Sequence, residues 1–192
     1  MPTYPIMSAL NFQLEKFSTP LGQMLLVSDE QQQLRAIDWQ DHEARMQLLM
    51  RRQYKGVAVS LRDAAKASPA RRILEAYFEG DLGSIERIPV ALGGTDFQRQ
   101  VWTALRGIPA GQVLSYGDFA KRLGRPSAAR AVGLANGANP VSIVLPCHRV
   151  IGSNASLTGY GGGLQRKRWL LEHETALAAF SPDRHSGTLP GF

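Results

Sequence analysis

The run Asn139–Val150 restricts the fold of this chain more than any other stretch. It reads Asn-Pro-Val-Ser-Ile-Val-Leu-Pro-Cys-His-Arg-Val. Residues 141–145 are apolar except for one serine and are rich in β-branched types, which predicts a short buried strand or extended segment. Pro146 excludes a helix here and restricts the backbone of the residue before it. The chain therefore presents a thiol, Cys147, at the end of a rigid apolar segment.

Cys147 is the only cysteine among the 192 residues. A lone cysteine is often a small, buried and unreactive side chain, and the thiol alone leaves that interpretation open. His148 and Arg149 follow it directly, however, and cationic neighbours favour the thiolate, which is the nucleophilic form. One cysteine cannot form an internal disulfide, which is typical of a reducing cytoplasm. The sequence has no Cys and His cluster at zinc spacing, so we expect no metal and no other cofactor.

Signals for two short helices lie upstream of the cysteine. Thr95 and Gln98 form a capping box that opens a helix to about Arg106. Ser115 caps the next helix, in which Tyr116 and the apolar residues at 119, 120 and 123 share one face. On periodicity alone, Tyr116 is a candidate for chemistry, and a core tyrosine on the helix face stays open as the alternative.

A third helix follows a turn that contains Gly124. Its predicted cap is Ser127, and it runs to about Ala135 with small residues throughout, so it is thin. Two short helices joined by a tight glycine-containing turn form a helix-turn-helix. Arg130 is the only charged residue on the thin helix, where it is either solvated or available to reach the bases of a nucleic acid.

Downstream of the cysteine, the loop 158–163 contains four glycines, which permit a close backbone approach to a ligand. The segment 164–175 is predicted to be a helix with Trp169, Leu170 and Leu171 facing inward. Glu174 lies one turn beyond Leu170 and is expected to face inward as well. Three basic residues on the same helix are expected to be solvated: Arg166, Lys167 and Arg168.

The first half of the chain reads as a small α/β unit. After a loose leader, residues 10–17 form a candidate strand, and two apolar runs at 24–28 and 34–39 predict a hairpin. Helical spacing predicts a helix over 43–54. A second helix begins with Ser68 as its cap and Pro69 in its first turn, and ends at Gly80. This half contains no charged cluster of a catalytic type, so we expect it to be a scaffold.

Net charge is distributed unevenly between the two halves. Residues 1–92 contain 11 Lys and Arg against 11 Asp and Glu, whereas residues 93–192 contain 11 against 5. The whole formal charge of +6 therefore lies in the half that contains Cys147. A basic surface of this kind is either simply solvated or a site of phosphate contact. The sequence has no apolar run of membrane-spanning length and no signal-peptide pattern at its start.

The order of these motifs resembles one known family. The sequence Pro-Cys-His-Arg-Val around Cys147, the upstream helices and the Tyr160-Gly161-Gly162-Gly163 loop resemble the O6-alkylguanine-DNA alkyltransferases, in their bacterial branch. The family is also called the methylated-DNA–protein-cysteine methyltransferases. The resemblance extends from about Thr95 to about Glu174 and is weaker before that.

The resemblance implies a fold and an activity. It implies a ribonuclease H-like α/β domain over 1–92 and a mainly helical domain with a winged-helix-like helix-turn-helix over 93–178. Residues 179–192 lack a pattern, which predicts a disordered tail. It implies a monomeric cytoplasmic protein that repairs double-stranded DNA by taking the alkyl group of O6-alkylguanine, with O4-alkylthymine as a second candidate lesion. The alkyl group would stay on Cys147, so that each molecule reacts once. The sequence leaves the preferred size of the alkyl group open.

The resemblance also assigns roles to residues. Cys147 would be the nucleophile, and His148 would act as its base through a bridging water. Glu174 would orient His148 and favour its charged form. Tyr116 would donate a proton to the leaving base. Asn139 would brace the turn before the active site. Arg130 would fill the gap left by an extruded nucleotide, with the thin helix in the minor groove. The other expected DNA contacts are Ser127, Ala128, Ala129 and Tyr116, and the expected pocket residues are Val150, Tyr160, Gly161 and Gly162. Arg149 is instead a candidate buried ion partner.

The sequence departs from the family pattern at Gly161, where many relatives carry Ser or Ala, so we expect a roomier pocket. Three other functions remain as alternatives. A non-catalytic lesion binder of the same fold would lack the cysteine. A cysteine hydrolase would need turnover, and an adjacent Cys-His pair suits it poorly. A helix-turn-helix transcription regulator is the third, and the sequence has no sensor domain with extra cysteines.

Overall fold

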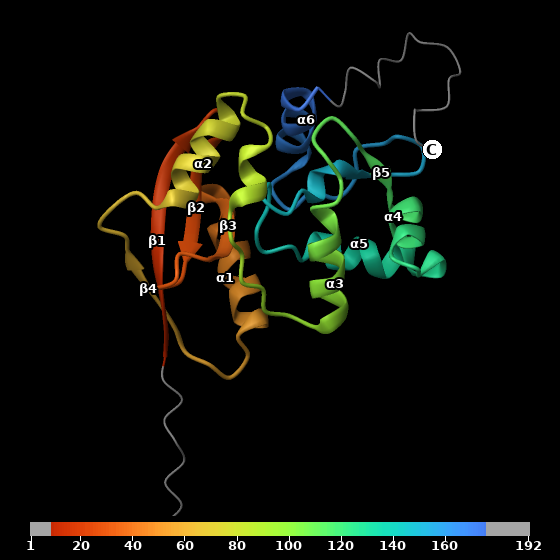
Figure 1. Cartoon of the computed structure of the whole chain (residues 1–192). Coiled ribbons are helices and arrows are strands. Elements are labelled where there is room, and N and C mark those ends of the chain that lie inside the picture. The colour runs from red at the N-terminus through yellow and green to blue at the C-terminus, as the bar shows by residue number, and fades with distance from the viewer. Residues whose placement is uncertain (1–8, 176–192) are drawn as a thin grey trace, which may run out of the picture.

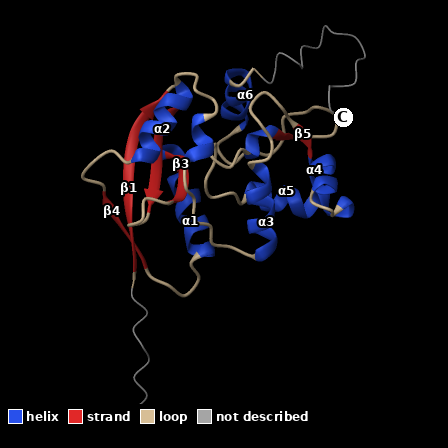
Figure 2. Cartoon of the chain, viewed as in Figure 1, coloured by secondary structure: helices blue, strands red, loops and turns tan. Residues whose placement is uncertain are grey.

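The computed structural model describes residues 9–175, so residues 1–8 of the predicted leader over 1–9 and the whole predicted tail over 179–192 lie outside the described residues. A sheet occupies one side of the molecule and a group of helices the other (Figure 1, Figure 2). The sheet has the order β3-β2-β1-β4. Its strands are β1 (Leu10–Thr19), β2 (Gly22–Ser28), β3 (Leu34–Trp39) and β4 (Val59–Asp63).

The predicted first strand and hairpin are confirmed. β1 pairs antiparallel with β2, and β2 pairs antiparallel with β3. β4 was not predicted. It pairs parallel to β1, with Leu10 opposite Val59. Its five residues contain no apolar run, so the strand depends on the neighbouring edge of β1 and not on a local pattern.

Helices cover both faces of the sheet, and β2 is buried on each. Met24 and Leu26 face α2 (Pro69–Phe78), whereas Leu25 and Val27 face α1 (Glu43–Gln53), as the alternation of a strand requires. Both helices were predicted. Ser68 caps α2 as expected, since its hydroxyl accepts a hydrogen bond from the Arg71 amide at 3.2 Å.

The second half is mainly helical, as predicted. The capping box of Thr95 and Gln98 is complete, and Ser115 accepts a hydrogen bond from the Asp118 amide at 3.0 Å. The elements are α3 (Asp96–Leu105), β5 (Leu114–Ser115), α4 (Tyr116–Arg122), α5 (Ala129–Gly137), β6 (Val150–Ile151) and α6 (Leu164–His173).

The predicted cap of the third helix is wrong. Ser127 lies in a 3-10 turn, Pro126–Ala128, and α5 begins after it with Ala128 at the cap position. No side chain caps this helix end. Proline at the start of a tight turn sets the local backbone, so the serine lies one residue too early to cap.

The prediction of a short buried strand or extended segment over Val141–Leu145 is confirmed for the burial, but the backbone does not form a strand. The segment is buried, but it forms a tight turn in which the Leu145 amide donates to the Val141 carbonyl at 3.0 Å. Ile143 has a φ of 72°, which is rare for a β-branched residue. A single bridge, Ile37 to Val141, connects the turn to β3. The hydrophobic pattern predicted the burial of this segment correctly, but it did not predict the backbone conformation.

One core joins the two halves. Side chains of β3 and α2 pack with those of α3, α4, α5 and the Val141–Leu145 turn in a single cluster. Trp102 of α3 is fully buried and donates from Nε1 to the Ala135 carbonyl at 2.8 Å. Between residues 9 and 175, no helix combines the length and hydropathy that a membrane crossing requires.

Candidate active site

Asn139 braces the turn that carries the cysteine, as expected. Its Nδ2 donates to the Leu145 carbonyl at 2.7 Å, and its Oδ1 accepts from the Val141 amide at 2.9 Å. Asn139 is fully buried, so both ends of the turn are bound by one rigid side chain. These two bonds hold the turn closed. Cys147 follows, 5% exposed, at the start of the 3-10 turn Cys147–Arg149.

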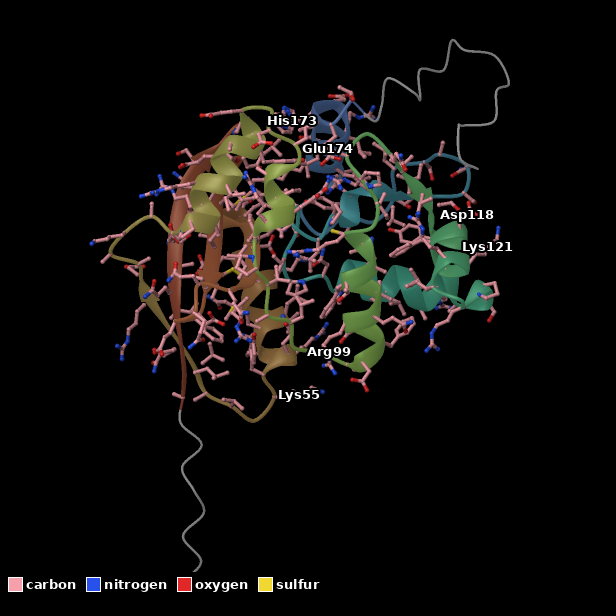
Figure 3. All side chains as sticks on the ribbon, in the orientation of Figure 1. Lys55, Arg99, Asp118, Lys121, His173 and Glu174 are labelled. Atoms are coloured by element: carbon pink, nitrogen blue, oxygen red, sulfur yellow. The ribbon has the colours of Figure 1, made fainter. Side chains whose placement is uncertain are left out.

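Glu174 contacts both His148 and Arg149. The His148 Nε2 lies 3.0 Å from Glu174 Oε1, and Arg149 donates to both carboxylate oxygens at 2.8 Å. All three side chains are buried. Figure 3 shows Glu174 at the end of α6, where the sheet side and the helical side of the molecule meet. The inward position of Glu174 and the buried ion pair of Arg149 are both confirmed.

The charge state of this group follows from its contacts. Burial opposes a charged Glu174, but His148 and Arg149 outweigh burial and hold the pKa of Glu174 well below its ordinary value. The pKa of His148 is lowered, because burial and Arg149 outweigh the attraction of Glu174. Glu174 does favour the charged imidazole, as expected, but His148 is neutral on balance.

The tautomer of His148 is therefore determined. An ionised carboxylate only accepts, so the imidazole proton lies on Nε2, and Nδ1 is left as an acceptor. Nδ1 is buried and has no hydrogen-bond partner among residues 9–175. A neutral imidazole with a free, buried lone pair is suited to take up a proton.

The environment of the thiol differs from the sequence-based expectation. Burial raises the pKa of Cys147, and Asn139, Lys167 and Arg45 act in the opposite direction. Arg149 was expected to favour the thiolate, but it is bound to Glu174 instead. The cations that act on the sulfur therefore come from α6 and α1, and the thiol is protonated at rest.

Lys167 was expected to be solvated, and that prediction is wrong. It is fully buried and donates from Nζ to the carbonyls of Val150 and Thr158, at 2.6 and 2.7 Å. Burial lowers its pKa to about 8. The signal was present in the sequence, since Lys167 lies three residues before Leu170 and seven before Glu174, on the same helix face.

Tyr116 lies beside the cysteine and is held by Asn136, a residue that the sequence did not single out. The Asn136 Nδ2 lies 3.4 Å from the Tyr116 hydroxyl and 3.3 Å from the Cys147 carbonyl. Burial raises the pKa of Tyr116, and Cys147 adds to the shift while Asn136 opposes it. Asn136 is 2% exposed, and its Oδ1 has no partner among the described residues.

The glycine loop approaches the first half of the chain closely. A Cβ atom at Gly161 would collide with the guanidinium of Arg45, and one at Gly162 would lie 2.5 Å from Nε1 of Trp39 at the end of β3. Arg45 was not identified as a site residue from the sequence. It forms an ion pair with buried Asp38 at 2.6 Å and donates to the Gly137 carbonyl at 3.1 Å. The expected roomier pocket is therefore not found at Gly161, because Arg45 fills the space.

The pocket residues and the expected DNA contacts lie in different places. Val150 and Tyr160 are buried near the thiol. Tyr116, Ala129 and Arg130 line an open groove of about 540 Å³ between α4 and α5. Arg130 is exposed at this groove, and its contact with DNA stays a prediction. Ser127 is exposed and Ala128 is partly buried, and both precede α5.

Known proteins match the chain along most of its length. A family model described as 6-O-methylguanine DNA methyltransferase, ribonuclease-like domain, matches residues 14–92, and one described as the DNA binding domain of the same family matches 96–176. A methylated-DNA–protein-cysteine methyltransferase of Salmonella typhimurium is 54% identical over 160 residues, which is 83% of this chain and 94% of the relative.

Solved structures of the same family are also similar to this chain in sequence and fold. The Mycobacterium tuberculosis OGT in complex with DNA is 38% identical, with a TM-score of 0.66 over 87% of this chain and 94% of that one. An O6-methylguanine-DNA methyltransferase from Pyrococcus kodakaraensis is 29% identical, with a TM-score of 0.67 over 85% of this chain and 98% of that one. The motif around Cys147, the buried His148–Glu174 pair and these matches agree, and the chain belongs to the 6-O-methylguanine DNA methyltransferase family.

Proposed function

We propose that Cys147 repairs DNA by taking the alkyl group from O6-alkylguanine and keeping it. The observation that carries this is the arrangement of His148, whose Nε2 is bound to Glu174 so that Nδ1 is free to accept a proton. O4-alkylthymine presents its alkyl group in the same way and is a second candidate lesion. The reaction class is nucleophilic displacement at saturated carbon.

Proton transfer and displacement are coupled in this proposal. The thiol proton passes through a water molecule to His148 Nδ1, and the sulfur attacks the alkyl carbon. The new S–C bond forms as the C–O6 bond breaks, and the electron pair of that bond leaves with guanine. Because burial raises the pKa of the Cys147 thiol, the thiol is protonated before substrate binds. His148 then removes the thiol proton when substrate is in place.

Tyr116 supplies the proton that the departing guanine needs. The Cys147 carbonyl can only accept, so the side-chain atom of Asn136 that faces it is the nitrogen. The same nitrogen faces the Tyr116 hydroxyl, so this hydroxyl accepts from Asn136 and keeps its own proton for donation. Donation neutralises the negative charge that develops on the base, and proton return from His148 restores Tyr116.

The lesion must leave the duplex to reach Cys147, because the thiol is buried. We propose that α5 enters the minor groove and that exposed Arg130 fills the gap left by the extruded nucleotide. The small residues on α5 allow a close approach, with Ala128 and Ala129 near the backbone and Ser127 in the turn before the helix. Val150, Tyr160, Gly161 and Gly162 then surround the flipped base.

Several properties of the whole molecule belong to this proposal. The domain boundaries at residues 92 and 178, the ribonuclease H-like and winged-helix-like character of the two halves, the monomeric state and the cytoplasmic location stay predictions. The matched description of a ribonuclease-like domain over 14–92 supports the first of these folds.

The decisive experiment measures stoichiometry. The protein is incubated with excess duplex that contains O6-methylguanine, and repaired lesion is expected to plateau at one per active molecule, because a thioether is a poor electrophile and the chain has no second cysteine. Peptide mass spectrometry should place one methyl group on Cys147. The Cys147→Ser variant is the control. Continued turnover would favour the hydrolase alternative, and binding without an adduct would favour the lesion binder.

A second experiment tests the role of Arg130. Arg130→Ala should slow transfer from duplex DNA roughly tenfold more than transfer from free O6-methylguanine base, since extrusion costs a few kcal/mol only in the duplex. Arg62→Ala removes an equal, exposed charge from the first half and serves as the control. Equal slowing with both substrates would place Arg130 in folding or in the pocket instead.

A further inference from the structure

Tyr77 connects the first half of the chain to the candidate catalytic group. It lies on α2, far from Cys147 in sequence, and is fully buried. Its hydroxyl lies 2.7 Å from Glu174 Oε1. The carboxylate accepts only, so the hydroxyl donates. Burial, with Glu174 itself, raises the pKa of Tyr77 well above its ordinary value, so that the hydroxyl remains protonated at working pH.

Glu174 Oε1 is crowded with donors. It receives Tyr77 at 2.7 Å, Arg149 Nη2 at 2.8 Å and His148 Nε2 at 3.0 Å. A carboxylate oxygen offers two lone pairs, so these three donors share them. The shortest of the three bonds is the one from Tyr77, and it withdraws electron density from the oxygen that His148 uses.

The Tyr77 ring is held rigidly at the end of α6. His173 Nε2 lies 2.7 Å from the Tyr77 carbonyl, and its ring meets the Tyr77 ring edge-on at 5.2 Å. Trp169 stacks on His173 at 4.7 Å with an interplanar angle of 17°. Figure 3 shows His173 beside Glu174 at this junction. A rigid donor from α2 therefore sets the position of the carboxylate.

We propose that Tyr77 is a positioning residue for the alkyl-transfer reaction. The Tyr77 hydroxyl donates to Glu174 and fixes the position of the carboxylate. The same hydrogen bond weakens the attraction of Glu174 for a second proton on His148, so that His148 stays neutral with Nδ1 free. The first half of the chain is then part of the reactive machinery and not a scaffold alone. This inference rests on the function proposed above, in which neutral His148 is the base.

The test uses Tyr77→Phe, which keeps the ring and removes only the hydroxyl. Glu174 then attracts the proton on His148 more strongly, and we expect the pKa of His148 to rise by about one unit, since one hydrogen bond to a charged group has roughly that energy. Nuclear magnetic resonance of labelled histidine reports this shift in protein without DNA. It therefore tests Tyr77 even if the protein fails to repair O6-methylguanine.

The kinetic counterpart is the pH profile of methyl transfer from duplex DNA. In Tyr77→Phe the loss of rate on the acid side should move to higher pH by the same amount, with a rate at pH 7 reduced roughly tenfold or less. Tyr54→Phe removes a hydroxyl from α1's end that contacts Arg35, and it should change neither measurement. An unchanged His148 pKa, or a slower reaction with an unmoved acid limb, would overturn the proposal.

A second variant covers the case in which Tyr77→Phe does not fold. Site-specific 3-fluorotyrosine at position 77 keeps the fold and strengthens the donor. The expected shift has the opposite sign, with a lower pKa for His148. A rise in that pKa, or no change, would contradict the role assigned to Tyr77.

Discussion

The side-chain nitrogen of Asn136 donates a hydrogen bond to the hydroxyl of Tyr116, across 3.4 Å. The same nitrogen donates to the Cys147 carbonyl at 3.3 Å, which determines the orientation of the amide. Tyr116 is thereby tied to the backbone of the nucleophile. The relationship links the Tyr116 hydroxyl and the Cys147 backbone in space, although neither position suggests it in the sequence.

The first prediction concerns Asn136. Asn136→Leu removes the donor, and methyl transfer should slow roughly tenfold, because the Tyr116 hydroxyl loses its orientation. Asn136→Asp should slow it further, since a carboxylate accepts the Tyr116 proton and faces the Cys147 carbonyl with like polarity. Single-turnover kinetics on an O6-methylguanine duplex measure both.

Tyr116→Phe provides the control for that prediction. If Asn136 acts through the hydroxyl, Asn136→Leu should have little effect in the Tyr116→Phe background. Full additivity of the two substitutions would show that Asn136 acts through the Cys147 carbonyl alone.

The second prediction concerns Arg45 and Gly161. Arg45→Gln removes a cation that lowers the pKa of the Cys147 thiol, so the midpoint of thiol alkylation by iodoacetamide should move to higher pH by roughly 0.5 unit. Gly161→Ala should shift it in the same direction, since the new Cβ displaces the guanidinium. Combining the two should add nothing further.

Arg51→Gln is the matched control, because Arg51 is an exposed arginine on the same helix. Arg45→Gln also leaves Asp38 buried without its ion pair, so folded protein is confirmed by circular dichroism first. An unmoved alkylation midpoint in folded Arg45→Gln protein would contradict an electrostatic role for Arg45.

The third prediction is the pH dependence of transfer. His148 accepts a proton only when it is neutral, and its pKa is lowered from 6.5 by burial. The rate should therefore be constant near neutral pH and fall on the acid side, as pH drops through the lowered pKa of His148. A rate that already falls between about pH 7.5 and pH 6.5 would show that the charged imidazole dominates.

The fourth prediction concerns the buried amine of Lys167. Lys167→Met leaves the carbonyls of Val150 and Thr158 without their donor, and the free energy of unfolding should fall by about 2 kcal/mol. Urea unfolding at neutral pH measures this. Arg168→Met changes an exposed neighbour on the same helix and should have little effect.

The pH dependence of that difference has a definite sign. The pKa of Lys167 falls from 10.5 to about 8 on folding, so above pH 8 the unfolded chain binds more protons than the folded one. Stability of the parent protein should rise relative to Lys167→Met between those values, by up to about 2 kcal/mol near pH 9.5. A difference that narrows over this range would contradict a lowered pKa.

Local signals in the sequence were sufficient for many elements. Caps such as Thr95 and Ser68 act on amides three residues away, and a hairpin joins neighbouring runs, so the sequence alone determined these starts and turns. The helical period also placed Glu174 inward. The nucleophile and its motif were recognised from residues that are adjacent in the chain.

Other features depend on contacts between distant segments, and only the tertiary structure decided them. The Val141–Leu145 segment has the composition of a strand, but hydrogen bonds from the Asn139 side chain hold it as a turn. Ser127 has the chemistry of a cap but lies in a proline-initiated turn. In both cases a neighbouring group determined the backbone conformation, which composition does not encode.

The charges around Cys147 also depend partly on adjacent residues in the sequence and partly on contacts between distant segments. The sequence placed His148 and Arg149 beside Cys147, but the structure directs both toward Glu174 and brings Lys167 and Arg45 to act on the sulfur instead. Hydrogen bonds and charge interactions depend on distance in space, and Tyr77 reaches Glu174 across 97 positions of chain. The identity of the nucleophile was thus determined by the sequence, whereas its protonation state was decided by the fold.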